Sequence, residues 1–145
     1  PRGSARFYVG VGMPGTTVAS VDRTTLQSAR SFIAGRVQQL DGVRVAPERE
    51  SPRDATQVIR RESLTGFYLD SSIVSVETRP DGGVRAAVSV VVQSYPDRNV
   101  RSMLSGAATV MGESGPAAQR AAIEAALTGA LRNLGTAMSA GAPRR

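Results

Sequence analysis

The stretch from Thr65 to Val110 constrains the fold most, because apolar side chains recur there at every second residue. A period of two is typical of a strand that buries one face. Two turn sequences, Pro80-Asp81-Gly82-Gly83 and Pro96-Asp97-Arg98-Asn99, divide the stretch, and their residue types favour hairpin turns. The middle segment alternates most regularly, and its expected inward residues are Val84, Ala86, Val88, Val90 and Val92. The pattern predicts a meander of three antiparallel strands.

The outer strands of this expected meander each carry one irregularity. In the first, the apolar residues change parity between Ile73 and Val74, which predicts a bulge near Ser71-Ser72. In the third, Gly106 stands where the pattern would place a bulkier side chain. The expected inward residues of that strand are Val100, Leu104, Ala108 and Val110.

The residues before the meander predict a β-α-β unit and a second helix. Arg6 to Met13 alternates like a strand, and a helix capped by Asp22 or Ser20 follows it. The apolar positions of this helix recur at steps of three and four: Leu26, Ala29, Ile33, Val37 and Leu40. Gly42 ends the helix, and a short strand at 43–45 follows. Ser51 and Pro52 are typical of a helix start, and that helix runs to about Ser63.

The last helix is expected to begin at Ser114 and Pro116 and to run to Met138 with a broad alanine and leucine face. The whole order is β-α-β-α-β-β-β-α. We therefore predict a single α+β domain over residues 5–138, with a mixed sheet, a three-strand antiparallel meander and helices packed mainly on one face.

The ends of the chain are set apart from this domain. Residues 1–4 match the end of a protease site used in expression vectors and are interpreted as a tag remnant. Residues 139–145 are expected to form a flexible tail. A membrane would then be reached only through an anchor missing from this sequence, because stretches such as Val90 to Val92 fall far short of the roughly 20 residues of a spanning helix.

Cysteine and histidine are both absent from the 145 residues. Their absence excludes disulfides, thiolate zinc sites, cysteine nucleophiles and a Ser-His-Asp triad within this sequence. The available carboxylates lie in an expected loop, at Glu48 and Glu50, and in expected turns, at Asp81 and Asp97. Their positions favour an ordinary role in loops and turns over acid-base catalysis. We predict no enzymatic activity, no catalytic residue, no metal and no cofactor.

Gly10, Gly12 and Gly15 spell the glycine pattern of a dinucleotide-binding turn, G-x-G-x-x-G. In such a turn the helix begins within the glycines, so that its N-terminus meets the pyrophosphate. Here Pro14 and several further residues precede the helix at Asp22. The pattern is therefore interpreted as a strand packed closely against a neighbour.

The formal charge of +6 comes from 18 basic and 12 acidic residues, and every basic residue is an arginine. Arginine can contact anions and tyrosine can supply a stacking face. The candidate partner-binding residues on this reasoning are Arg60, Arg61, Tyr95, Arg98 and Arg101. Only 4% of the chain is aromatic, so a solvated surface is favoured over a nucleic-acid groove.

The sequence Leu64-Thr65-Gly66-Phe67-Tyr68-Leu69, followed by two hairpins and an alanine-rich helix, resembles the amino-terminal domain of TolB and the related CsgG and LpoB lipoproteins. The resemblance implies a non-enzymatic periplasmic or outer-membrane-associated domain, part of a larger protein or lipoprotein, that binds a protein partner in the bacterial envelope. Homo-oligomerisation through exposed sheet edges is a further expectation. The alternative is an arginine-mediated binder of nucleic acid or another acidic polymer, whose affinity would fall steeply with salt.

Overall fold

The computed structural model describes residues 5–112 and 115–141. The expected tag remnant, Ser114, and residues 142–145 of the expected tail lie outside that part. The elements follow the order β1 (Phe7–Val11), β2 (Gly15–Thr16), α1 (Arg23–Gln38), β3 (Val43–Val45), α2 (Pro52–Glu62), β4 (Thr65–Thr78), β5 (Val84–Ser94), β6 (Val100–Val110), α3 (Gly115–Leu131) and α4 (Leu134–Gly141).

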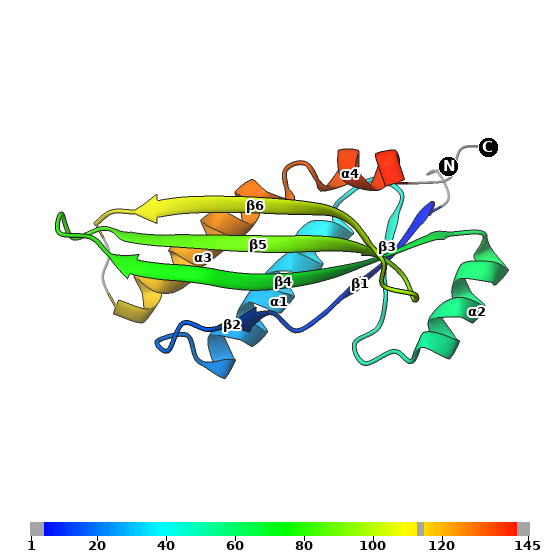
Figure 1. Ribbon diagram of the computed structural model, residues 1–145, viewed down its shortest axis with the longest axis horizontal. Helices are drawn as coiled ribbons and strands as arrows, with labels where there is room; N and C mark the ends of the chain where they lie inside the picture. Colours follow the sequence, from blue (N-terminus) through cyan, green and yellow to red (C-terminus); the bar gives the residue numbers. More distant parts are fainter. Residues whose placement is uncertain (1–4, 113–114, 142–145) are drawn as a thin grey trace.

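The strands form one mixed sheet in the order β3-β1-β4-β5-β6, with β2 paired to β4. β1 runs parallel to β3 and to β4, whereas β4, β5 and β6 are antiparallel and make the long meander. The helices α1 and α3 lie behind the long strands in Figure 1, on one side of the sheet. The predicted α+β class and its helix-covered mixed sheet are confirmed.

The main core lies between this helix layer and the sheet. Its sheet side includes the five alternate residues of β5 from Val84 to Val92, all buried as the alternation predicted. Its helix side includes Ile33 of α1 and Ile123 and Leu127 of α3. Gly106 of β6 faces α3 so closely that an added Cβ would meet backbone atoms of Ala126 and Ala130. The missing side chain at this position therefore allows α3 to approach the sheet.

Two helix starts follow the capping residues that the sequence predicts. An Asp22 carboxylate oxygen accepts from the Thr25 backbone N–H at 2.8 Å and caps α1. The Ser51 hydroxyl accepts from the Asp54 N–H at 3.1 Å and caps α2. Each cap satisfies a backbone donor that the first helical turn leaves without a partner.

One bulge was expected, near Ser71-Ser72, and the structure has two register shifts. In β4 the register shifts between Ile73 and Ser75, so the extra residue is Val74. A second shift places Val100 opposite Gln93, and Val100 is 62% exposed instead of buried. An inserted residue moves every later side chain of the strand to the opposite side of the sheet. The alternation of apolar residues alone does not show where the insertion lies.

The segments at either end of the domain also differ in detail. β1 ends at Val11, and Met13 is exposed in the connection to the unexpected short strand β2. The expected last helix is divided into α3 and α4, and α4 continues to Gly141, into the range expected to be tail. Within the described residues, no helix combines the length and apolar character needed to cross a membrane.

Candidate functional site

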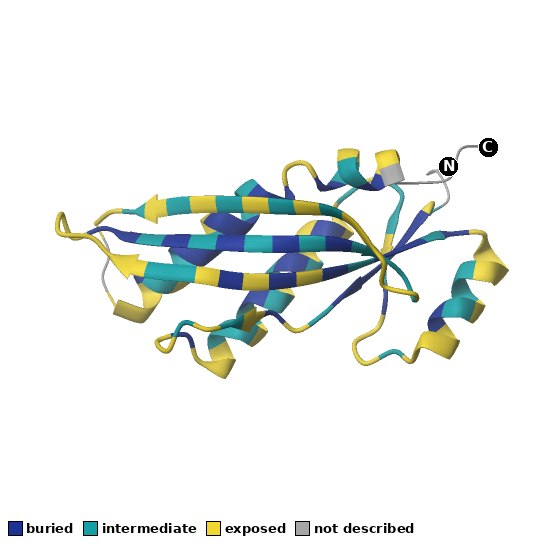
Figure 2. Ribbon diagram, viewed as in Figure 1, coloured by how far each residue is buried: buried dark blue, intermediate teal, exposed yellow. Residues whose placement is uncertain are grey.

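The side of the sheet away from α1 and α3 is uncovered along most of the meander (Figure 1). We call it the open face and define it by the outward residues Asp70, Ser72, Ala87, Ser89, Val91, Met103, Ser105 and Ala107, together with Val74 and Val100 at the two bulges. Figure 2 shows the alternation of exposed and half-buried residues along β6. Most of these side chains are small, and Asp70 is charged; Glu77 and Arg85 lie on the same side of the sheet, toward the β4–β5 turn.

Apolar side chains are exposed on this face to an unusual degree. Met103 is 69% exposed, Val100 62% and Val74 55%. Val91 pairs with Met103 across the β5–β6 ladder, which makes the apolar surface continuous there. A shallow depression of about 510 Å³ lies next to Val74, floored by small residues such as Ala87 and Ala107. Exposed apolar side chains gathered on one face are typical of a protein contact.

The outer edge of the sheet is formed by β6, which has eleven residues. Only β5 pairs with it within the described residues, so the backbone groups on its other side are unpaired with any strand. Its sequence contains one charged residue, Arg101, and no proline. Native edge strands are usually protected by charges, prolines or a covering element. The composition of β6 therefore suits strand pairing or another contact along this edge.

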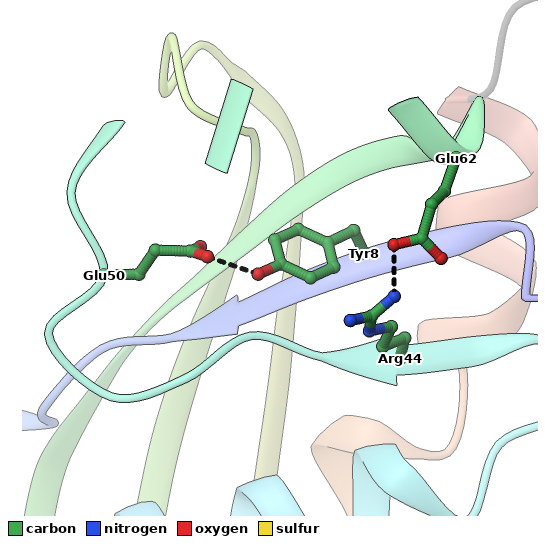
Figure 3. A network of polar contacts seen from close by, with 4 residues as sticks. All are labelled: Tyr8, Arg44, Glu50 and Glu62. Atoms are coloured by element: carbon green, nitrogen blue, oxygen red, sulfur yellow. Dashed lines mark hydrogen bonds and ion pairs between the residues drawn. The ribbon is translucent and has the colours of Figure 1, made fainter. Parts of the chain in front are cut away.

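At the end of the sheet nearest α2, the same side carries a group of polar aromatic residues that we call the tyrosine cluster: Tyr8, Tyr68, Tyr95 and Glu50. The Glu50 carboxylate accepts hydrogen bonds from the hydroxyls of Tyr8 (Figure 3) and Tyr95, the latter at 3.2 Å. The Tyr68 and Tyr95 ring centroids are 5.3 Å apart. The three tyrosines, which are all that the chain contains, come together because β1 pairs in parallel with β4 and the end of β5 lies beside them.

The early glycines belong to this cluster. A Cβ at Gly10 would meet the Tyr68 ring at 2.8 Å, and one at Gly12 would overlap the Tyr68 hydroxyl. The glycine pattern therefore leaves room for a tyrosine that lies across β1. This agrees with the interpretation of a strand packed closely against a neighbour.

Burial and the Glu50 carboxylate perturb two of the tyrosines. Desolvation, followed by the charge and hydrogen bond of Glu50, raises the pKa of Tyr95 from 10.0 to about 12. The same causes raise the pKa of Tyr8. Both hydroxyls therefore stay protonated over the physiological range and act as hydrogen-bond donors. Figure 3 also shows the ion pair of Arg44 with Glu62, which joins β3 to α2 beside Tyr8.

The five predicted partner-binding residues lie in two places. Tyr95 belongs to the tyrosine cluster, and the Arg98 guanidinium lies 4.1 Å from the centre of the Tyr68 ring. Arg101 follows at the start of β6 and is exposed. Arg60 and Arg61 are exposed in the last turn of α2, and no hydrogen bond or ion pair between described residues joins their side chains to the other three. That these five residues bind a partner stays a prediction.

Within the described ranges, no three acidic side chains lie close enough together to hold a metal ion. The open face itself was missed at the sequence level, where Met103 and Asp70 were not singled out. The sequence does contain one signal, a run of nine residues without a charge from Ser102 to Val110, but that run alone does not place the strand at the edge of the sheet.

The fold and the open face define a class: an α+β domain whose mixed sheet is covered by α1 and α3 on one side and is open along most of the meander on the other. No family model and no curated protein sequence matches the chain. Among solved structures, a variant of PelC from Paraburkholderia phytofirmans, solved as a dodecamer, aligns over 92% of this chain and 91% of its own at 19% identity and a TM-score of 0.60. The protein CT253 from Chlamydia trachomatis aligns over 94% and 95% at 13% identity and a TM-score of 0.57. The protein XCC0632 (DUF330) from Xanthomonas campestris aligns over 97% and 88% at 13% identity and a TM-score of 0.54.

These findings correct the resemblance to TolB, CsgG and LpoB. The solved structures with which this fold aligns include PelC, CT253 and XCC0632, and at such low identities they establish the fold alone. One of the residues that carried the resemblance, Gly66, is explained by local packing. A Cβ at Gly66 would overlap the Tyr95 carbonyl oxygen and approach the Ile59 side chain to 2.6 Å. Gly66 is therefore explained by packing between α2, β4 and the β5–β6 turn, without reference to a family motif.

Proposed function

We propose that this chain is a non-enzymatic assembly domain that binds further copies of itself through the open face and the edge of β6. The observation that carries the proposal is the set of exposed apolar side chains Val74, Val100 and Met103 on the side of the meander away from α1 and α3. Burying such a surface in a protein contact is favourable in proportion to its apolar area.

The edge strand supports the same conclusion. An eleven-residue edge with a single charge gives little protection against pairing with another chain. The likeness to PelC, which was solved as dodecamers, supports assembly by this fold. A place in the bacterial cell envelope belongs to the same proposal, and fractionation of cells that express the native gene tests it.

The proposal is tested by light scattering across a range of protein concentrations. We expect wild type to be oligomeric and Met103→Glu to dissociate, because the substitution places a charge inside the proposed contact. The matched control is Met13→Glu. Met13 is also an exposed methionine, at 45%, but it lies outside the meander. A wild type that stays monomeric at high concentration, or a Met103→Glu protein with the mass of wild type, would refute the proposal.

A further inference from the structure

A ring of more than two subunits, built from one repeated contact, needs two different surfaces on each subunit. The open face supplies one of them. We propose that the second surface is a hollow between α1, α3 and α4, and that it receives Met103 from the open face of the next copy. This inference rests on the proposed function, since it concerns how the same copies meet.

The hollow has a volume of about 360 Å³ and lies where the end of α1 meets the junction of α3 and α4. Its floor is apolar: Val37, Leu131 and Leu134 are buried, and Leu40 is half-buried. The unbranched, flexible side chain of methionine suits an irregular apolar hollow of this kind. At 69% exposure, Met103 is the most exposed of the large apolar side chains in the described residues.

One carboxylate on the open face, that of Asp70, is complementary in charge to the arginines around the hollow. Arg36 and Arg132 line the hollow, both are exposed, and neither guanidinium pairs with a carboxylate among the described residues. Asp70 lies two strands from Met103 on the open face, in the row Asp70–Val91–Met103, and has no ion pair with a described residue. Adjacent strands are separated by about 4.8 Å, which places Asp70 roughly 10 Å from Met103. With Met103 seated in the hollow, Asp70 would lie at its arginine rim.

This arrangement is favoured over face-to-face pairing. If two open faces met about a two-fold axis, each would place the same apolar row and the same Asp70 in the contact, and the arginines of the hollow would stay outside it. Such an isologous contact closes at two subunits. Matching opposite charges across an interface also fixes which surfaces meet.

Charge reversal tests the pairing. We expect Asp70→Arg, and separately the double variant Arg36→Glu/Arg132→Glu, to weaken association roughly tenfold or more, measured by light scattering over a concentration series. Combining all three substitutions in one chain should restore much of the association, because the opposite charges meet again with reversed sign. Arg120→Glu is the matched control, since it makes the same charge change on an exposed arginine near the start of α3.

Mixing variants tests whether the contact is heterologous, that is, whether two different surfaces meet. Met103→Glu keeps its hollow, and Arg36→Glu/Arg132→Glu keeps its open face, so an equimolar mixture should form heterodimers and nothing larger. If Arg36→Glu/Arg132→Glu assembles like wild type while Met103→Glu does not, the hollow is excluded and assembly through the open face stands. If both variants assemble like wild type, the proposed function fails as well. If the triple variant does not regain association, the pairing of Asp70 with the arginine rim is contradicted.

Discussion

The two sides of β5 come from the same eleven residues but differ in what they contact. On the covered side every alternate residue from Val84 to Val92 is buried against α3 and the main core. On the open side the intervening residues, Arg85, Ala87, Ser89, Val91 and Gln93, are only half-buried and no helix packs on them. Neighbouring strands cover part of each, and the rest faces solvent.

The comparison shows that a sheet side without helices need not be a polar side. Two rows of the open face, Ser72–Ser89–Ser105 and Ser75–Ala87–Ala107, consist of hydroxyl and small apolar residues. Met103, Val74 and Val100 on the same face are more than half exposed. On the covered side, small residues let a helix approach. On the open side, similar residues leave a depression. The difference is the reason for assigning assembly to the open side.

The strongest test of this comparison adds atoms to β6 on each side in turn. Gly106→Ala should lower the free energy of unfolding by about 2–3 kcal/mol, because its Cβ would press on the α3 backbone at Ala126 and Ala130. Ala107→Val adds more atoms at the next residue, but on the exposed open side, and should change stability by less than about 0.5 kcal/mol. Urea unfolding midpoints with unchanged slopes give both values. Equal effects would mean that α3 is not seated on Gly106.

The next test concerns the one part of the uncovered side that is packed, the tyrosine cluster. Tyr95→Phe should lower stability by about 1 kcal/mol at neutral pH, because it removes the hydrogen bond to the Glu50 carboxylate. Tyr68→Phe is the matched control, since the Tyr68 hydroxyl forms no hydrogen bond with a described residue. We expect the control to unfold close to the wild-type urea midpoint. A loss at Tyr68→Phe as large as that at Tyr95→Phe would contradict the role of Glu50.

The pH dependence of unfolding distinguishes the same hydrogen bond from simple packing. The pKa of Tyr95 is raised from 10.0 to about 12 in the folded protein. Between these values the unfolded chain loses the proton and the folded chain keeps it, so stability falls as pH rises through this window. We expect wild type to lose stability more steeply than Tyr95→Phe in urea unfolding at a series of alkaline pH values. Parallel curves would show that Tyr95 titrates normally.

The regular parts of the fold could be predicted because local physics decides them. The alternation at Val84 to Val92, the cap at Asp22 and the turn at Pro80-Asp81-Gly82-Gly83 each depend on residues within one segment, and the structure confirms the strand, the helix start and the connection. The bulge in β4 lies at Val74, slightly past the expected Ser71-Ser72, and the irregularity near Val100 was not expected, because a bulge is defined by the partner strand and not by its own sequence.

The candidate site was harder to predict, since it depends on which strands become neighbours. Tyr8, Tyr68 and Tyr95 are far apart in the sequence, but the parallel pairing of β1 with β4 brings them together. Met103 belongs to an edge strand, and a single sequence does not show which strand lies at the edge. The hollow likewise requires the division between α3 and α4, which the continuous alanine and leucine pattern concealed.

The smallest effect is expected at a pair of serines on β4 that face opposite sides. Ser71 is 2% exposed on the covered side, and its hydroxyl has no hydrogen-bond partner among the described residues. A buried hydroxyl without a partner carries a desolvation cost, so Ser71→Ala should raise stability by up to about 1 kcal/mol. Ser72 is exposed on the open face, and Ser72→Ala should leave the urea midpoint within about 0.5 kcal/mol of wild type. If Ser71→Ala destabilised the protein instead, the Ser71 hydroxyl would have to satisfy a polar group inside the core, and the covered side would be less purely apolar than its valines indicate.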